Sequence, residues 1–170
     1  MKDSMNKALN EQINAELYSS YLYLSMSSYF SSINLSGMAT WMRVQAQEEM
    51  FHSMKIYDFV NERGGRAIMQ AIDQPPADWP STMAVFENVL AHEQKVTSLI
   101  NNLVDLSMSE RDHATTIFLQ WFVTEQVEEE ANVSGILNKL KMIGNDASSL
   151  FALDQELGQR VFTMPAATAT

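Results

Sequence analysis

Cysteine is absent from this sequence, so the chain can form no disulfide, no iron–sulfur cluster and no thiolate zinc site. That absence fits a reducing compartment. Long apolar runs are also missing, since no stretch approaches the roughly 18 consecutive apolar residues of a membrane-spanning helix. The first residues lead into an amphipathic pattern rather than the apolar centre of a signal peptide. We therefore expect a soluble, cytoplasmic protein with no membrane partner.

Basic residues are scarce as well. The chain has 11 lysines and arginines against 21 aspartates and glutamates, which gives a formal net charge of -10. No basic patch stands out, so binding to the phosphate backbone of a nucleic acid is not expected. With 170 residues, of which 46% are hydrophobic, the chain is long and apolar enough for one domain with its own core. We expect residues 1–160 to form this domain and residues 161–170 to be a disordered tail.

The sequence does contain four long segments with the spacing of an amphipathic helix. In each segment, residues on one face recur at alternating steps of four and three, as on a helix that packs against neighbours. The four series are Leu9, Ile13, Glu16, Ser20, Tyr23, Ser27 and Phe30; Met38, Met42, Gln45, Glu49, His52, Ile56 and Phe59; Phe86, Leu90, Glu93, Thr97, Ile100 and Val104; and Thr115, Leu119, Phe122, Gln126, Glu129, Val133, Ile136 and Leu140. The pattern predicts an all-α protein.

Residues that favour helix ends separate these segments. In chain order they are a break at 34–37 with Ser36 as N-cap, Gly64 and Gly65, Ser81 as N-cap, a capping box at 109–112, Gly144, and Asp146 as N-cap. The helix that follows Asp146 is short, over roughly residues 147–157. We thus expect four long helices and a short fifth one.

The links between the long helices differ in length, which decides their directions. Short turns near 34–36 and 109 make the first and second helices, and the third and fourth, antiparallel neighbours. The link at 64–80 has 17 residues, which can extend over about 55 Å, whereas a 28-residue helix is about 42 Å long. This link can therefore cross the whole bundle and make the second and third helices parallel.

Near the middle of each series, apolar residues give way to residues that can bind metal. They are Glu16, Glu49 with His52, Glu93, and Gln126 with Glu129. At least four carboxylates would meet at one depth of the core, and the same series offer no basic partner. Unpaired buried carboxylates cost several kcal/mol or become protonated, so bound cations are the natural compensation. Carboxylates with one imidazole suit divalent iron or manganese better than a closed zinc site.

The sequence resembles the ferritins, most closely the bacterial non-haem type, over about residues 4–160. The resemblance rests on ligand residues in the right order on four helices, on Tyr23 two turns after Glu16, and on Trp121 ahead of the cluster at 124–130. It implies a ferritin-like four-helix bundle with one long crossover and a short fifth C-terminal helix.

The second ligand pair separates this chain from the bacterioferritins. Diiron bundles of that kind carry Glu-x-x-His on two helices. Here Glu49 and His52 keep one such pair, whereas Gln126 and Glu129 replace the other. That replacement is typical of ferritins.

The resemblance divides the ligands between two iron ions. Glu16, Glu49 and His52 would hold the first ion, and Glu49 would bridge to a second ion held by Glu93 and Glu129. Gln126 would lie beside the pair as a weak ligand or hydrogen-bond donor.

Bacterial ferritins also have a third iron site. The positions that match it here are Glu48, Glu125, Glu128 and Glu129. Without the resemblance, a charge run such as 128–130 would indicate only a solvated helix face. Tyr23 matches a tyrosine beside the diiron centre, either as an electron donor or as a core tyrosine with a satisfied hydroxyl.

The implied reaction is oxidation of two Fe(II) ions by dioxygen, followed by hydrolysis of Fe(III) and growth of a ferric oxyhydroxide mineral. Carboxylates suit it because anionic oxygen ligands favour the ferric state. Ferritins assemble as hollow shells of twenty-four subunits, so the expected partner is a homo-oligomer around the mineral. Animal ferritins have acidic residues in an iron-access channel, where the matching positions of this chain are Thr116 and Leu119. They also have acidic residues facing the cavity, where this chain has Phe51 and Met54.

Other residues have ordinary explanations. Met50 aligns with the haem-binding methionine of bacterioferritins, but most of the 12 methionines are expected to fill the core, and no haem is expected. Trp121 is expected to pack, and His92 and His113 to lie at the surface or an interface.

Two further functions stay open on sequence alone. One is a diiron oxygenase or reductase that acts on an organic substrate, which usually needs a second histidine ligand. The other is a non-catalytic shell subunit or interaction bundle, which predicts lost ligands, whereas here all are present.

Overall fold

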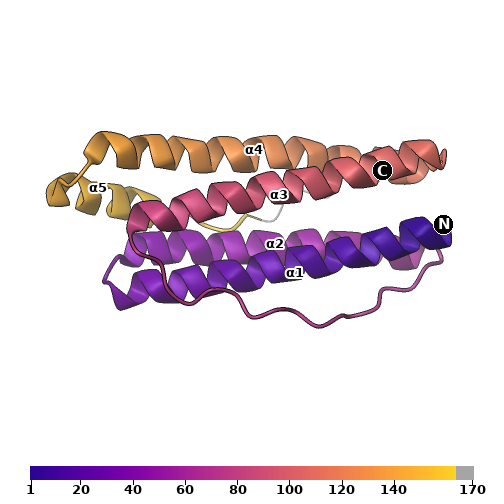
Figure 1. Cartoon of the computed structure of the whole chain (residues 1–170), viewed down its shortest axis with the longest axis horizontal. Coiled ribbons are helices and arrows are strands. Elements are labelled where there is room, and N and C mark those ends of the chain that lie inside the picture. Colours follow the sequence, from indigo (N-terminus) through magenta and orange to yellow (C-terminus); the bar gives the residue numbers. More distant parts are fainter. Residues whose placement is uncertain (164–170) are drawn as a thin grey trace.

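The computed structural model describes residues 1–163, which form five α-helices and no strand. The helices are α1 (Asp3–Ser32), α2 (Ser36–Glu62), α3 (Thr82–Ser109), α4 (His113–Ile143) and α5 (Ala147–Leu157). The four long helices lie side by side as a bundle, and α5 folds back at the end where α4 finishes (Figure 1). The predicted fold is confirmed. Residues 164–170, most of the predicted tail, lie outside the described residues. None of the described helices is long and apolar enough to span a membrane.

The crossover at residues 63–81 gives the bundle its topology. It runs without helix along α1, from the end of α2 to the start of α3, so α2 and α3 point the same way (Figure 1). Hydrogen bonds tie it to α1: the Asn10 side chain donates to the Arg66 carbonyl at 3.0 Å, and the Ser25 hydroxyl to the Pro76 carbonyl at 2.6 Å. The link between the two hairpins is therefore tied to α1 near both of its ends.

The helix boundaries agree with the prediction except at two N-caps. Ser81 and Asp146 cap α3 and α5 as expected, each accepting a backbone N–H three residues ahead. Ser36 is instead the first residue of α2. Ser109 is the last residue of α3, and Asp112 caps α4. The predicted capping box was therefore wrong.

Two apolar clusters fill the bundle and leave a polar layer between them. Their fully buried members include Met26, Phe30, Met38, Met42 and Phe86 in one cluster, and Met5, Leu9, Ile56, Ile100 and Leu119 in the other. Most of these residues belong to the predicted series. In each hairpin, a cluster takes residues that precede the polar interruption on one helix and residues that follow it on the other.

The short helix α5 packs unusually close to the start of α2. A Cβ atom on Gly37 would lie 1.7 Å from the Asp154 carbonyl oxygen, so only glycine fits at this position. The Asp154 carboxylate also accepts the Met38 backbone N–H at 2.8 Å. These contacts fix where the chain emerges after α5.

Candidate metal centre

The four long helices bring the predicted ligand residues to one level of the core, between the two apolar clusters. None is more than 5% exposed; they are Glu16, Glu49, His52, Glu93, Gln126 and Glu129. A polar layer of this composition is costly unless its charges are compensated.

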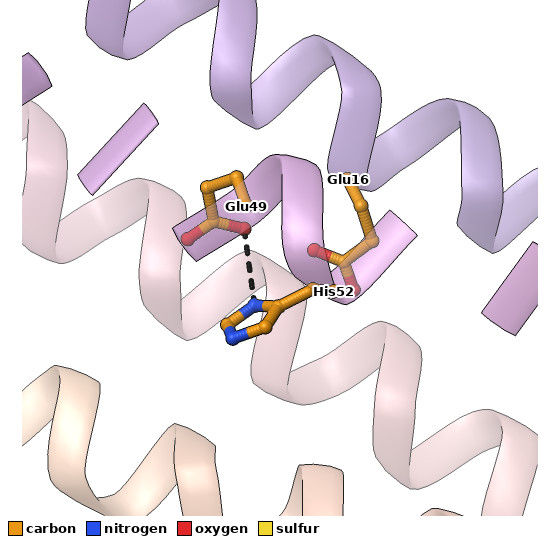
Figure 2. Close-up of side chains that lie close together, drawn as sticks. All are labelled: Glu16, Glu49 and His52. Carbon is orange, nitrogen blue, oxygen red and sulfur yellow. Dashed lines mark ion pairs between the residues drawn. The ribbon is translucent and has the colours of Figure 1, made fainter. Parts of the chain in front are cut away.

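One group of ligands joins α1 to α2. Figure 2 shows the Glu16 side chain reaching from α1 towards Glu49 and His52 on α2. One ligand atom from each of the three lies within 4.8 Å of the others, and His52 Nδ1 is 3.5 Å from Glu49 Oε2. The Trp121 ring, which packs as predicted, lies edge-on to the imidazole at 5.3 Å. Glu16 Oε2 is buried, and within residues 1–163 it has no hydrogen-bond partner.

The α3–α4 hairpin completes the layer with a hydrogen-bonded group around Glu93. The Tyr23 hydroxyl donates to Glu93 Oε1, and Gln126 Nε2 donates to Glu93 Oε2 at 3.2 Å. Gln45 Nε2 donates to Glu129 Oε2 at 2.7 Å and more weakly, at 3.4 Å, to Glu49. Amide and phenol donors thus hold the carboxylates of this half.

Burial makes these carboxyls weak acids. It raises the pKa of Glu16 and Glu49 well above the ordinary value, with added repulsion from neighbouring carboxylates. Burial likewise raises the pKa of Glu93. Burial and then the charge of Glu93 raise the pKa of Glu129 to about 8. The layer therefore holds protons at neutral pH that a cation would displace.

The predicted third-site residues lie at the edge of this layer in three different settings. Glu125 and Glu129 form a second group with His52, in which ligand atoms lie within 4.8 Å of one another. The Glu48 carboxylate is paired with Arg160. Glu128 is exposed.

The two histidines outside the layer differ in exposure. His92 is half-buried: its ring nitrogen is 2.7 Å from the Ser19 hydroxyl, and burial lowers its pKa to about 4. His113 is exposed. Leu119 is fully buried in the core, as its place in the predicted series indicates.

Three residues that support the layer were not predicted. Gln12 Nε2 donates to Glu16 Oε1 at 2.8 Å. Gln45 lies one turn before Glu49 on the predicted series, and that polar position was a usable signal. Arg160 donates to Gln45 and Glu48 from beyond α5, where the sequence pattern gave no signal.

Comparison with known proteins gives a family match over most of the chain. The profile of the ferritin-like domain family matches residues 6–143. Bacterial non-haem ferritins from Bacteroides fragilis and Staphylococcus aureus are 46% and 38% identical, and the alignments span 94% and 95% of this chain and 99% and 98% of those proteins.

Solved structures give the same result. An engineered closed form of the Archaeoglobus fulgidus ferritin superimposes with a TM-score of 0.95 at 56% identity, over 96% of this chain and 99% of the other. The open-pore ferritin from that archaeon superimposes with a TM-score of 0.94 at 55% identity, over 95% of this chain and 99% of the other. The chain therefore belongs to the ferritin family, and family and fold together support a role in iron storage.

Proposed function

We propose that this chain is a ferroxidase subunit: it oxidises Fe(II) with dioxygen at a diiron centre and passes Fe(III) to a ferric oxyhydroxide mineral inside a shell of identical subunits. The observation that carries the proposal is the buried Glu16 carboxylate: its Oε2 has no hydrogen-bond partner among the described residues, and the side chain belongs to a group with Glu49 and His52. An unpaired buried oxygen is costly, and a cation between these three side chains would satisfy it.

The substrate ions would be held by both hairpins. Glu16, Glu49 and His52 bind the first Fe(II), and Glu49 bridges to the second, which Glu93 and Glu129 hold. Two Fe(II) ions supply one electron each, and dioxygen takes both with two protons to give hydrogen peroxide. Anionic oxygen ligands stabilise the Fe(III) product over Fe(II), which favours the electron transfer.

Neighbouring hydrogen-bond donors orient these ligands. Tyr23 and Gln126 hold the two oxygens of Glu93, and Gln45 holds Glu129. A carboxylate held in this way keeps its position while the ions come and go. Electron donation by Tyr23 stays a prediction, as does a third ion at the edge of the layer.

Assembly into a shell is supported by apolar side chains that a lone chain leaves exposed. They lie on α1 and the crossover and include Tyr21, Leu24, Ile68, Met69 and Ile72, between 39% and 57% exposed. Such a surface is typical of a subunit interface. Twenty-four subunits of 19.2 kDa would give a particle of about 460 kDa, which native mass spectrometry measures.

The catalytic proposal is tested by anaerobic calorimetry followed by oxygen uptake. We expect two tightly bound Fe(II) ions per chain, and consumption of one dioxygen per two Fe(II) on admission of air. Glu93→Ala and His52→Ala should slow the fast phase of oxidation and leave the particle mass unchanged.

Matched controls come from exposed residues of the same types. Glu87→Ala on α3 and His113→Ala on α4 remove an acid and an imidazole away from the layer. Both controls should oxidise Fe(II) at the wild-type rate. Wild-type rates in the Glu93 and His52 variants, or no tight ferrous binding by the native chain, would refute the proposal.

A further inference from the structure

Arg160 brings a positive charge to the acidic layer from outside the four long helices. It lies three residues beyond the end of α5, and its backbone N–H donates to the Leu157 carbonyl at 3.3 Å. Gly158, two residues before Arg160, packs against Gly37: a Cβ atom added to Gly158 would lie 3.0 Å from the Gly37 Cα. Backbone packing therefore fixes this segment beside the start of α2.

The guanidinium contacts three side chains of α2. Nη1 donates to Gln45 Oε1 at 2.7 Å, Nη2 is paired with the Glu48 carboxylate, and Cζ lies 4.5 Å from the centre of the Trp41 ring. A planar guanidinium can hold the amide and the carboxylate at once, whereas a lysine ammonium is a point charge without this fork geometry.

The contact with Gln45 decides which way the buried amide points. Arginine can only donate, so Gln45 must present its oxygen to Arg160 and its Nε2 to Glu129 and Glu49. A reversed amide would place its oxygen against two carboxylates.

The contact with Glu48 concerns the third iron position. Glu48 is one of the four residues matched to that position, and Glu125 and Glu129 already lie with His52 in a potential metal-binding group. The Glu48 carboxylate is, however, paired with Arg160. A metal ion and the guanidinium would compete for this carboxylate.

We propose that Arg160 is a built-in counter-ion and positioning residue at the third iron position, and that a cation taking Glu48 as a ligand must first displace it. The displaced guanidinium also releases Gln45, which loosens the hold on Glu129. Filling of the third position is thereby coupled to the paired site. This inference rests on the proposed function, because it needs ions at the paired site.

Zn(II), which does not react with dioxygen, tests the competition by calorimetry on the assembled protein. In Arg160→Gln we expect the third ion of each chain to bind about tenfold more tightly, because a competing half-buried ion pair is lost. Arg160→Lys keeps the charge that competes for Glu48, although not the fork that also holds Gln45. The third affinity should therefore stay near the wild-type value, which a purely structural role would not predict. Arg43→Gln removes an exposed charge of α2 and is the matched control.

Hydrogen exchange on the wild-type protein gives a readout that needs no substitution. The backbone N–H groups of Gln159 and Arg160 donate to Glu156 and Leu157. Their exchange should accelerate only after the third equivalent of Zn(II), when the segment is displaced.

Three results would overturn this inference and leave the proposed function standing. The first two are an unchanged affinity for the third Zn(II) in Arg160→Gln, and a rise of that affinity in Arg160→Lys as large as in Arg160→Gln. The third is unchanged hydrogen exchange of Gln159 and Arg160 at the third equivalent of Zn(II). Failure of the wild-type protein to bind the first two ions refutes the proposed function instead, and the inference falls with it.

Discussion

Metal binding at this centre should release protons in a number that depends on pH, and Glu129 makes the effect measurable. Its pKa is raised to about 8 from an ordinary 4.5, so the metal-free protein holds a proton there at neutral pH. A carboxylate must be deprotonated to bind an ion, so the proton leaves on binding.

The size of the effect follows from the pKa. A group with a pKa of about 8 is about 0.9 protonated at pH 7, about 0.5 at pH 8 and about 0.1 at pH 9. Glu129→Gln should therefore release about 0.9 fewer protons per chain than wild type at pH 7, and about 0.1 fewer at pH 9. Burial raises the pKa of Glu16 and of Glu49 as well.

The assay is calorimetric titration with Zn(II) in buffers of different ionisation enthalpy. The slope of the observed binding enthalpy against the buffer ionisation enthalpy gives the number of protons released. Glu11→Gln removes a carboxylate that pairs with Lys7 on the surface of α1, and it should release the wild-type number. Equal release by wild type and Glu129→Gln at pH 7 would show that the reasoning about burial is wrong.

Three further predictions concern stability, and each is measured without added metal except where Zn(II) is named. A raised pKa means that the folded state binds the Glu129 proton more tightly than the unfolded state, so the melting temperature should fall as pH rises from about 4.5 to about 8; added Zn(II) should reverse this fall at pH 8. Tyr23→Phe leaves a buried Glu93 oxygen without its donor and should cost about 1–3 kcal/mol in calorimetric unfolding. Gly37→Ala should displace α5 at a cost of about 1–3 kcal/mol, seen as faster hydrogen exchange in α5 but not in α3.

The bundle and most of its buried polar layer could be predicted from the sequence because both depend on helical periodicity. Residues such as Glu16, Glu93 and Glu129 interrupt long apolar series, and a residue on a packed helix face is buried whatever its type. The unequal links then decided the directions of the helices. Prediction of the layer therefore needed no knowledge of which helices touch.

The errors arose where tertiary or local contacts, rather than helical periodicity, decide the structure. Ser109 was predicted to open a helix, but its hydroxyl donates to the Leu106 carbonyl, which lets it continue α3 as its last residue. Arg160 could not be predicted, because it is positioned by the packing of Gly158 and Gly37 across the molecule. No local pattern in the sequence encodes that contact.

The crossover at residues 63–81 joins two hairpins, each of which carries half of the centre. Ions shared between the two hairpins would form a non-covalent cross-link across this crossover, which is the longest non-helical connection within residues 1–163. The entropic cost of bringing the ends of a loop together grows with loop length, so a cross-link has its largest effect across the longest loop. A molecule cleaved within the crossover would then keep its two fragments together for as long as the ions stay bound. Iron would in that way hold together the protein that contains it.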